Sequence, residues 1–260
     1  MTNKYISMGL VNIRQNLTYF SDFAFSTIFI MVILYVYSYF WKAVYTTTPI
    51  EGYTIIQILW YLVFTEALVV SPRQIVGVIT DEVQNGDIAV HLTRPYHYVL
   101  HHYAVYLSGT ILKFPLYIIG GAFIVILTTG TITINPAGIP LLLLSALLSF
   151  TLSYVILATV GLLAFWTEDA RPIEYIVSKL VFILGGMLVP IDIFPQWIQT
   201  ISHYLPFIGI AYAPARLALN YTHTLALETI LLQIFWIMII AILLFFVYNK
   251  GVKKVVMNGG

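Results

Sequence analysis

The sequence predicts an all-α integral membrane protein with six transmembrane helices in a single domain, residues 1–260. The chain has only 12 Lys and Arg and 11 Asp and Glu residues, and long apolar runs separate them. Residues 23–41, 114–167 and 229–249 carry no charge at all. A helix rises about 1.5 Å per residue, so about 20 apolar residues match a hydrocarbon core of about 30 Å. A soluble protein of this length could not bury so much apolar surface.

The apolar runs give the order of the transmembrane elements. We expect spans at about 21–42, 53–73, 105–129, 139–166, 174–192 and 228–249. Gly, Asn and Pro residues at 130–138 favour a turn between the third and fourth spans, at the water interface. Before the first span, Ile6, Leu10 and Ile13 recur at helical spacing. They predict an N-terminal interfacial helix that lies on the membrane surface.

The distribution of Lys and Arg predicts that both termini lie in the cytoplasm. Six spans place both termini on one side of the membrane, and only Lys42 and Arg216 fall on the other side. Eight residues fall on the termini side: Lys4, Arg14, Arg73, Arg94, Arg171, Lys250, Lys253 and Lys254. The positive-inside rule therefore predicts cytoplasmic termini for this multi-pass protein, and we expect its membrane to be the cell membrane of a bacterium or archaeon. The Lys-rich tail is expected to anchor to lipid headgroups, and no basic patch suggests nucleic acid.

The connection between the second and third spans, residues 73–102, is predicted to form two short helices. Thr80 would cap the first helix, with Asp81 and Glu82 in its first turn, where the helix dipole favours acidic residues. Gly86 would interrupt that helix and allow a sharp turn.

The second of these short helices is predicted to present an apolar face to a soluble partner. Asp87 can cap it, Ile88 and Leu92 share one face, and Arg94 and Pro95 mark its end. A short charged helix with exposed Ile and Leu residues suits docking on another protein. The alternative is a solvated loop that is simply long.

The stretch after the fifth span, residues 185–207, is apolar but cannot be one helix. Pro190, Pro195 and Pro206 interrupt it. We expect short re-entrant helices on the outer side, shielded by protein, with Trp197 as an anchor at the interface.

These two stretches resemble segments of ABC-2 type permeases. Residues 86–95, Gly-Asp-Ile-Ala-Val-His-Leu-Thr-Arg-Pro, are similar to the run after the second span of that family. Residues 185–207 are similar to its Pro-rich segment after the fifth span. Ala89 departs from the pattern, because an acid is frequent there. The resemblance covers nearly the whole chain.

The resemblance implies the permease subunit of an ATP-driven ABC exporter. Such a subunit pairs with a second permease subunit, identical or related, and sits on separate ABC ATPase subunits that bind ATP and Mg²⁺. The second and fifth spans would line the substrate pathway. The resemblance implies an ATPase-docking element formed by Asp81, Glu82, Gly86, Asp87, Ile88, Leu92, Arg94 and Pro95. It implies an outer gate formed by Pro190, Phe194, Pro195, Trp197 and Pro206.

The sequence offers little support for other chemistry. It contains no phosphate-binding loop, so we expect no ATPase activity in this chain, and it contains no cysteine. The spacing of His97 and His101 could suit a metal, but no acidic co-ligand follows, and we expect interfacial helix residues instead. A stand-alone secondary transporter or channel is the main alternative, and a membrane enzyme is a weaker one. Inverted symmetry between the halves, which such a transporter would show, is not evident.

Ionisable residues within the spans are costly and are usually paired. Lys113 is expected to snorkel to the inner interface. Glu66 and Lys179 fall at similar depths by residue count; they could pair with each other or line a polar vestibule, and we predict that they are coupled.

Overall fold

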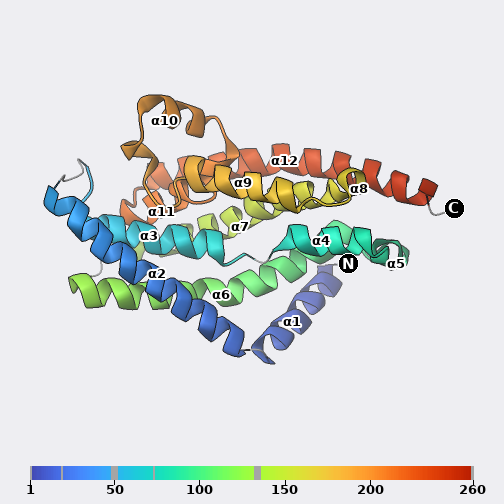
Figure 1. The fold of residues 1–260 in the computed structure, drawn as a ribbon, viewed down its shortest axis with the longest axis horizontal. Helices are drawn as coiled ribbons and strands as arrows, with labels where there is room; N and C mark the ends of the chain where they lie inside the picture. Colours follow the sequence, from blue (N-terminus) through green and yellow to red (C-terminus); the bar gives the residue numbers. More distant parts are fainter. Residues whose placement is uncertain (1, 19, 48–51, 73, 132–135, 259–260) are drawn as a thin grey trace.

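The computed structural model describes residues 2–18, 20–47, 52–72, 74–131 and 136–258, and the regular secondary structure of these residues is helical throughout. The helices pack lengthwise into a bundle, and both termini lie toward the same end of it (Figure 1). We call this end the termini end. The expected all-α architecture is therefore confirmed. Its helices are α1 (Thr2–Thr18), α2 (Phe20–Thr47), α3 (Ile55–Val70), α4 (Ile75–Gln84), α5 (Asp87–Thr93), α6 (Tyr98–Thr129), η1 (Pro136–Gly138), α7 (Ile139–Leu162), α8 (Ala164–Thr167), α9 (Arg171–Leu184), η2 (Ile191–Ile193), α10 (Gln196–His203), η3 (Pro206–Gly209), α11 (Tyr212–Leu219) and α12 (His223–Asn258).

Five helical stretches of the described chain are long and apolar enough to cross a membrane, so the protein is a multi-pass membrane protein. They overlap the first four predicted spans and the last one, and the second stretch, which runs from α3 into α4, extends beyond its predicted end at residue 73. Large apolar side chains point outward from them, and Phe25 on α2 and Ile242 on α12 are each 72% exposed. Such surfaces suit contact with lipid. The five stretches are Phe23–Thr47, Ile55–Gln84, Tyr98–Thr129, Pro136–Thr167 and His223–Lys254.

The prediction of a continuous fifth span at 174–192 is wrong. α9 ends at Leu184, so its 14 residues reach only about 21 Å. Gly185 follows as the C-cap, and Gly186 has a φ of 67°, which favours glycine. These two glycines end the helix before it matches the thickness of a bilayer.

The chain nevertheless passes along the bundle through α9 and the turn after it. At the start of α9, Arg171 forms an ion pair with Asp81, near the termini end. Beyond the turn, the hydroxyl of Tyr53, just before α3, donates to Asp192 at 2.5 Å, toward the opposite end of the bundle. The passage is therefore part helix and part irregular backbone.

The interior consists of two apolar clusters. One joins α4, α5, the start of α6, α7, α8 and α12, and it includes Ile79, Ile88 and Tyr98. The other joins α2, α3, α6 and α11, and it includes Trp60 and Tyr61. The first cluster fixes the helices of the termini end, and the second fixes those of the opposite end.

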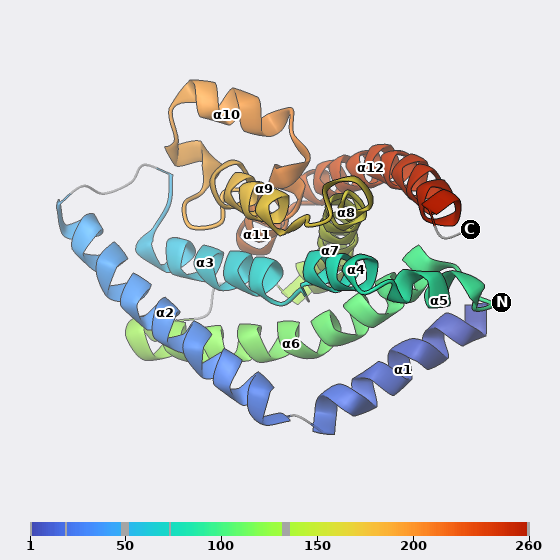
Figure 2. The ribbon, with the colours of Figure 1, turned by 45° about the vertical axis from the view of Figure 1, so that its right-hand side comes forward.

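The predicted N-terminal helix is confirmed as α1, which extends along the first half of α6 and then meets α2 at a sharp angle (Figure 2). One side of α1 faces α6, where the Ser108 hydroxyl donates to Asn12 Oδ1 at 2.9 Å. On its other side Ile6 is 58% and Leu10 is 54% exposed. An apolar face of this kind suits the surface of a membrane.

Candidate functional site

The segment predicted to dock on a partner forms a helical elbow at the termini end, residues 75–95, in which α4 and α5 meet at Gly86. Gly86 has a φ of 78°, a conformation that glycine adopts at little cost. It occupies the N-cap position of α5, and no side chain caps that helix, so the predicted capping by Asp87 is wrong. α5 ends at Thr93, directly before Arg94 and Pro95, as predicted.

The predicted start of the first short helix is also wrong. α4 begins at Ile75, five residues before Thr80, which is fully buried inside the helix. The apolar residues Ile75, Val76 and Ile79 draw this part of the chain into the termini-end cluster. Burial against the bundle therefore determines where the helix begins, and a side-chain cap does not.

The apolar face of α5 points inward, which corrects the prediction that it is exposed. Ile88 is only 2% exposed, and Leu92 packs against the same cluster. The outward face of α5 instead carries Val90, which is 53% exposed, with Ala89 and Thr93 beside it. Ile88 and Leu92 therefore attach the elbow to its own bundle, and a partner would meet the Val90 face.

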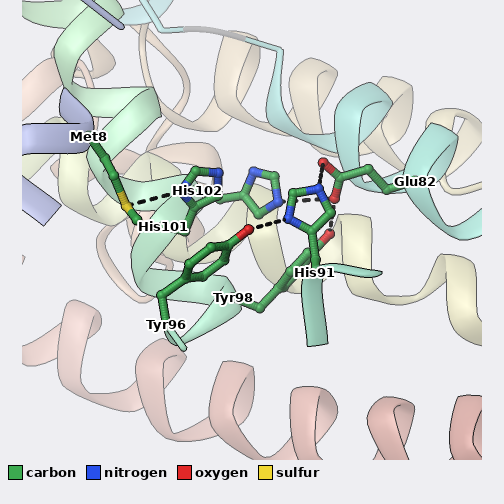
Figure 3. A network of polar contacts seen from close by, with 7 residues as sticks. All are labelled: Met8, Glu82, His91, Tyr96, Tyr98, His101 and His102. Carbon is green, nitrogen blue, oxygen red and sulfur yellow. Dashed lines mark hydrogen bonds and ion pairs between the residues drawn. The ribbon is translucent and has the colours of Figure 1, made fainter. Parts of the chain in front are cut away.

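A network centred on Glu82 connects the elbow to α6 (Figure 3). Glu82 Oε2 accepts a hydrogen bond from the Tyr98 hydroxyl at 2.5 Å and lies 3.0 Å from His102 Nε2. Glu82 Oε1 lies 3.5 Å from His91 Nε2 on α5. The Glu82 side chain is only 15% exposed, so these contacts replace much of its hydration. One carboxyl group thus connects α4, α5 and α6.

The network continues from the elbow to α1. His91 Nδ1 lies 2.7 Å from the Tyr96 hydroxyl, and the Tyr96 ring stacks on His101 with centroids 4.8 Å apart. His101 Nδ1 in turn lies 3.4 Å from the sulfur of Met8 on α1 (Figure 3). His91 and His101 therefore connect α5, α6 and α1 through noncovalent contacts.

Two further hydrogen bonds hold α1 against the end of the elbow. Lys4 Nζ donates to the Pro95 carbonyl at 2.7 Å, and the His97 amide donates to the Tyr5 hydroxyl at 2.9 Å. His97 itself does not join the network; its ring lies 5.0 Å from that of Tyr248, and burial lowers the pKa of His97. Within the described residues, no group of three His, Asp or Glu side chains is arranged to hold a metal ion.

Glu82 was predicted to lie in the elbow, but its histidine partners were not predicted. The pattern favoured a helix-dipole role for the acid and a headgroup region for the histidines. The four histidines within 12 residues, following an acid on the preceding helix, are a signal that could have suggested the network.

The elbow also contacts the turn before α9. Arg171 pairs with Asp81 and lies 3.6 Å from Asp169. Gln84 Nε2 donates to the Glu168 carbonyl at 3.0 Å. These groups are well exposed, so the ion pairs orient the elbow more than they stabilise it.

The residues of the predicted outer gate form a folded unit at the opposite end, in which α10 stands out from the bundle (Figures 1 and 2). Pro190 and Pro206 are buried, whereas Pro195 and Trp197 are exposed and Phe194 is half-buried. The predicted short helices are present as η2, α10, η3 and α11.

Asp192, which is not among the predicted gate residues, holds this unit together. Its carboxylate accepts hydrogen bonds from the hydroxyls of Tyr53 at 2.5 Å and Tyr212 at 2.8 Å. Its carbonyl accepts one from Gln199 Nε2 at 3.0 Å. Burial and the hydrogen bond to Asp192 raise the pKa of Tyr53, so its hydroxyl remains a donor at neutral pH. We call Tyr53, Asp192 and Tyr212 the outer clasp.

Glu66 and Lys179 are not brought together, and the described chain contains no ion pair between them. Glu66 is 3% exposed within α3, whereas Lys179 is exposed on α9 with its Nζ 4.9 Å from the centre of the Tyr175 ring. The prediction of a pair is wrong because equal depth does not fix the direction in which a helix points its side chains.

We therefore expect Glu66→Gln and Lys179→Met to act independently. Glu66→Gln removes a buried ionisable group without changing its shape, so stability should stay within about 1 kcal/mol of the wild type or rise. Thermal unfolding of both single variants and the double variant in detergent measures this. We expect the effects of the two substitutions on stability to add in the double variant. An interaction free energy above about 0.5 kcal/mol would mean that the two residues are coupled.

Comparison with known protein families supports the resemblance found in the sequence. No curated protein matches the chain. A family model described as ABC-2 family transporter protein matches residues 28–259, which is most of the chain. The chain belongs to the ABC-2 family of transporter proteins.

Proposed function

We propose that this chain is the permease subunit of an ATP-driven ABC-2 exporter, and that the elbow seats on a separate ATPase subunit. The observation that carries the proposal is the shape of the elbow within a transporter family. Its Ile88 side is buried in the bundle, and its Val90 side is exposed at the termini end. A short helix that packs against the bundle on one side and is exposed on the other can transmit the movement of a bound partner to the bundle.

The contacts of the elbow determine which helices such a movement would reach. The Glu82 network joins it to α6, the hydrogen bonds of Lys4 and Tyr5 join α1 to the end of the elbow and to the start of α6, and Arg171 joins α4 to α9. When ATP closes a pair of ATPase subunits, two elbows in two permease subunits would move toward each other. Movement of α9 would then reach the outer clasp, which we propose as the outer gate.

The proposal includes six crossings of the membrane with both termini in the cytoplasm. Five crossings are the long apolar stretches, and the sixth would be α9 with the turn after it. The contacts of Arg171 near the termini end and of Asp192 at the opposite end support that crossing. The excess of Lys and Arg on the termini side supports the orientation.

The docking proposal predicts a strong effect of Val90→Asp. A carboxylate placed in an apolar contact loses hydration without gaining a partner, so we expect ATPase affinity to fall about tenfold or more. Co-purification with the ATPase and permease-stimulated ATP hydrolysis both measure this loss. The variant should insert and fold normally because Val90 is 53% exposed.

The matched control for this test is Gln196→Asp, which adds the same charge to an exposed first-turn position of α10 at the other end. It should leave ATPase binding unchanged. Ile88→Asp is unsuitable, because Ile88 is 2% exposed and its replacement would disrupt the core. A Val90→Asp variant that binds and stimulates the ATPase like the wild type would rule out this face as the docking surface.

The orientation predicts which positions a membrane-impermeant thiol reagent can reach in intact cells. Because the chain has no cysteine, single cysteines report without background. Gln196→Cys should be labelled from outside, and Asn85→Cys, in the elbow, should be labelled only after the membrane is opened. Labelling of position 85 in sealed cells would reverse the proposed topology.

A further inference from the structure

A cavity of about 650 Å³ lies between α2, the break that separates α3 from α4, and the middle of α6. None of its lining residues belongs to the elbow's Glu82 network or to the outer clasp. Its walls are formed by Ser26, Phe29, Ile30, Val70, Pro72, Gln74, Val78, Lys113 and Tyr117.

One part of the cavity lining is polar, and the other part is apolar. Polar groups come from Ser26, Gln74 and Tyr117, and Lys113 is the only charged side chain among the described lining residues. On the outward side, Phe29 is 65% and Val70 is 37% exposed. A cationic and polar pocket with an exposed apolar margin matches a molecule that has an acidic head and apolar chains.

The position of the cavity fits the headgroup level of one leaflet. Lys113 Nζ lies 5.7 Å from the centre of the Phe23 ring, close to the start of α2. α1, with its exposed apolar face, joins α2 at the same level (Figure 2). The break that contributes Pro72 and Gln74 also lies there, at the start of the elbow. An interfacial helix and the end of a span mark the boundary between hydrocarbon and water.

The geometry points to a binding site for the acidic headgroup of a phospholipid from the leaflet on the termini side. Lys113 would contact the phosphate, Gln74 and Tyr117 would hydrogen-bond the head, and the acyl chains would follow Phe29 and the outer face of α2. A lysine ammonium has three N–H donors, so it can hold a phosphate oxygen alongside another contact. Lys113 then recognises a lipid as well as reaching the interface.

Native mass spectrometry of the purified full chain, titrated with lipid, tests this site. The probes are phosphatidylglycerol and phosphatidylcholine with the same acyl chains. The wild type should prefer phosphatidylglycerol at one site. Lys113→Gln should lower phosphatidylglycerol affinity about fivefold, the effect of one lysine near an anionic headgroup, and lower phosphatidylcholine affinity less, because the choline group offsets the charge of its phosphate. Lys113→Arg should keep the preference.

The matched control is Lys250→Gln, which removes an exposed lysine of α12 that does not line the cavity. It should keep the tight site. Should Lys113→Gln fail to fold, Gln74→Glu places an anion in the same wall and should weaken phosphatidylglycerol binding.

Two results would overturn the proposal: equal phosphatidylglycerol affinity in the wild type and in a folded variant, or displacement of the lipid by inorganic phosphate. The second result would assign the pocket to a free anion. The measurement needs no ATPase, so its outcome is separate from that of the docking test.

Discussion

Replacing Glu82 with glutamine is expected to lower the free energy of unfolding by about 2–4 kcal/mol. An ionised carboxylate only accepts hydrogen bonds, and here it faces the Tyr98 hydroxyl, His102 Nε2 and His91 Nε2. A glutamine side chain offers one acceptor oxygen and adds two N–H donors. At least one of the three partners, of which Tyr98 and His102 are buried, would then lose its acceptor, at a cost of about 1–3 kcal/mol, together with the loss of the negative charge.

Thermal unfolding in detergent measures this effect, and Asp81→Asn is the matched control. Asp81 precedes Glu82 on α4, but its side chain is 58% exposed, and its pairing with Arg171 is an exposed ion pair. Its replacement should cost no more than about 1 kcal/mol. Equal effects of the two substitutions would contradict the central role of Glu82.

The same substitution separates docking from coupling. The Glu82 side chain is only 15% exposed and is not part of the Val90 face, so a Glu82→Gln permease should still bind the ATPase. Because its elbow is less firmly attached to α6, we expect ATP hydrolysis to continue while transport falls. Val90→Asp should instead lose both binding and stimulation.

Composition alone predicted the helical fold, because charge-free runs of about 20 residues have few alternatives to a membrane span. It was less accurate at the helix ends. α6 begins at Tyr98, seven residues before its predicted apolar run, because residues 98–104 include two histidines and two tyrosines but still pack on α1 and α7. α9 was predicted too long because Gly185 and Gly186 are apolar by composition yet end the helix.

The sequence pattern could not predict the direction in which side chains point. The four-residue spacing of Ile88 and Leu92 places them on one face of α5, as the structure confirms by burying both toward the bundle. That spacing cannot distinguish a face turned toward a partner from one turned toward the chain's own core. Ile75 and Tyr98, which lie beside Ile88 in the termini-end cluster, decide between the two. The same limitation explains the missed separation of Glu66 and Lys179.

The outer clasp was missed for a different reason. Tyr53 and Asp192 are 139 residues apart, and each has an ordinary role in isolation, as a residue next to a span and as an acid in a turn. Only the return of η2 and α11 against α3 brings them together. The proline pattern predicted where the unit lies but could not identify the group that closes it.

The outer clasp makes Asp192→Ala the second substitution with a large expected effect. Its carboxylate accepts hydrogen bonds from two phenol groups, and hydrogen bonds to charged groups each contribute about 1.5–3 kcal/mol. Because Asp192 is exposed, the contribution of these hydrogen bonds is smaller. We expect the outer unit to open about tenfold more often, which corresponds to about 1.4 kcal/mol. A single cysteine at Val189, which is half-buried in the same unit, should then react about tenfold faster with a thiol reagent.

Two tyrosine substitutions establish whether the phenol–carboxylate contacts cause this opening. Tyr53→Phe removes one donor and should reproduce part of the increase in labelling. Tyr35→Phe removes an exposed hydroxyl on α2 that donates to the Tyr39 hydroxyl at 3.3 Å and should leave the rate unchanged. The raised pKa of Tyr53 keeps its hydroxyl protonated at the mildly alkaline pH that thiol labelling requires, so the clasp stays intact during the assay. If the cysteine at position 189 reacts at the same rate with and without Asp192, the clasp does not hold the outer unit closed, and the gate must be sought among the buried contacts of Pro190 and Pro206 instead.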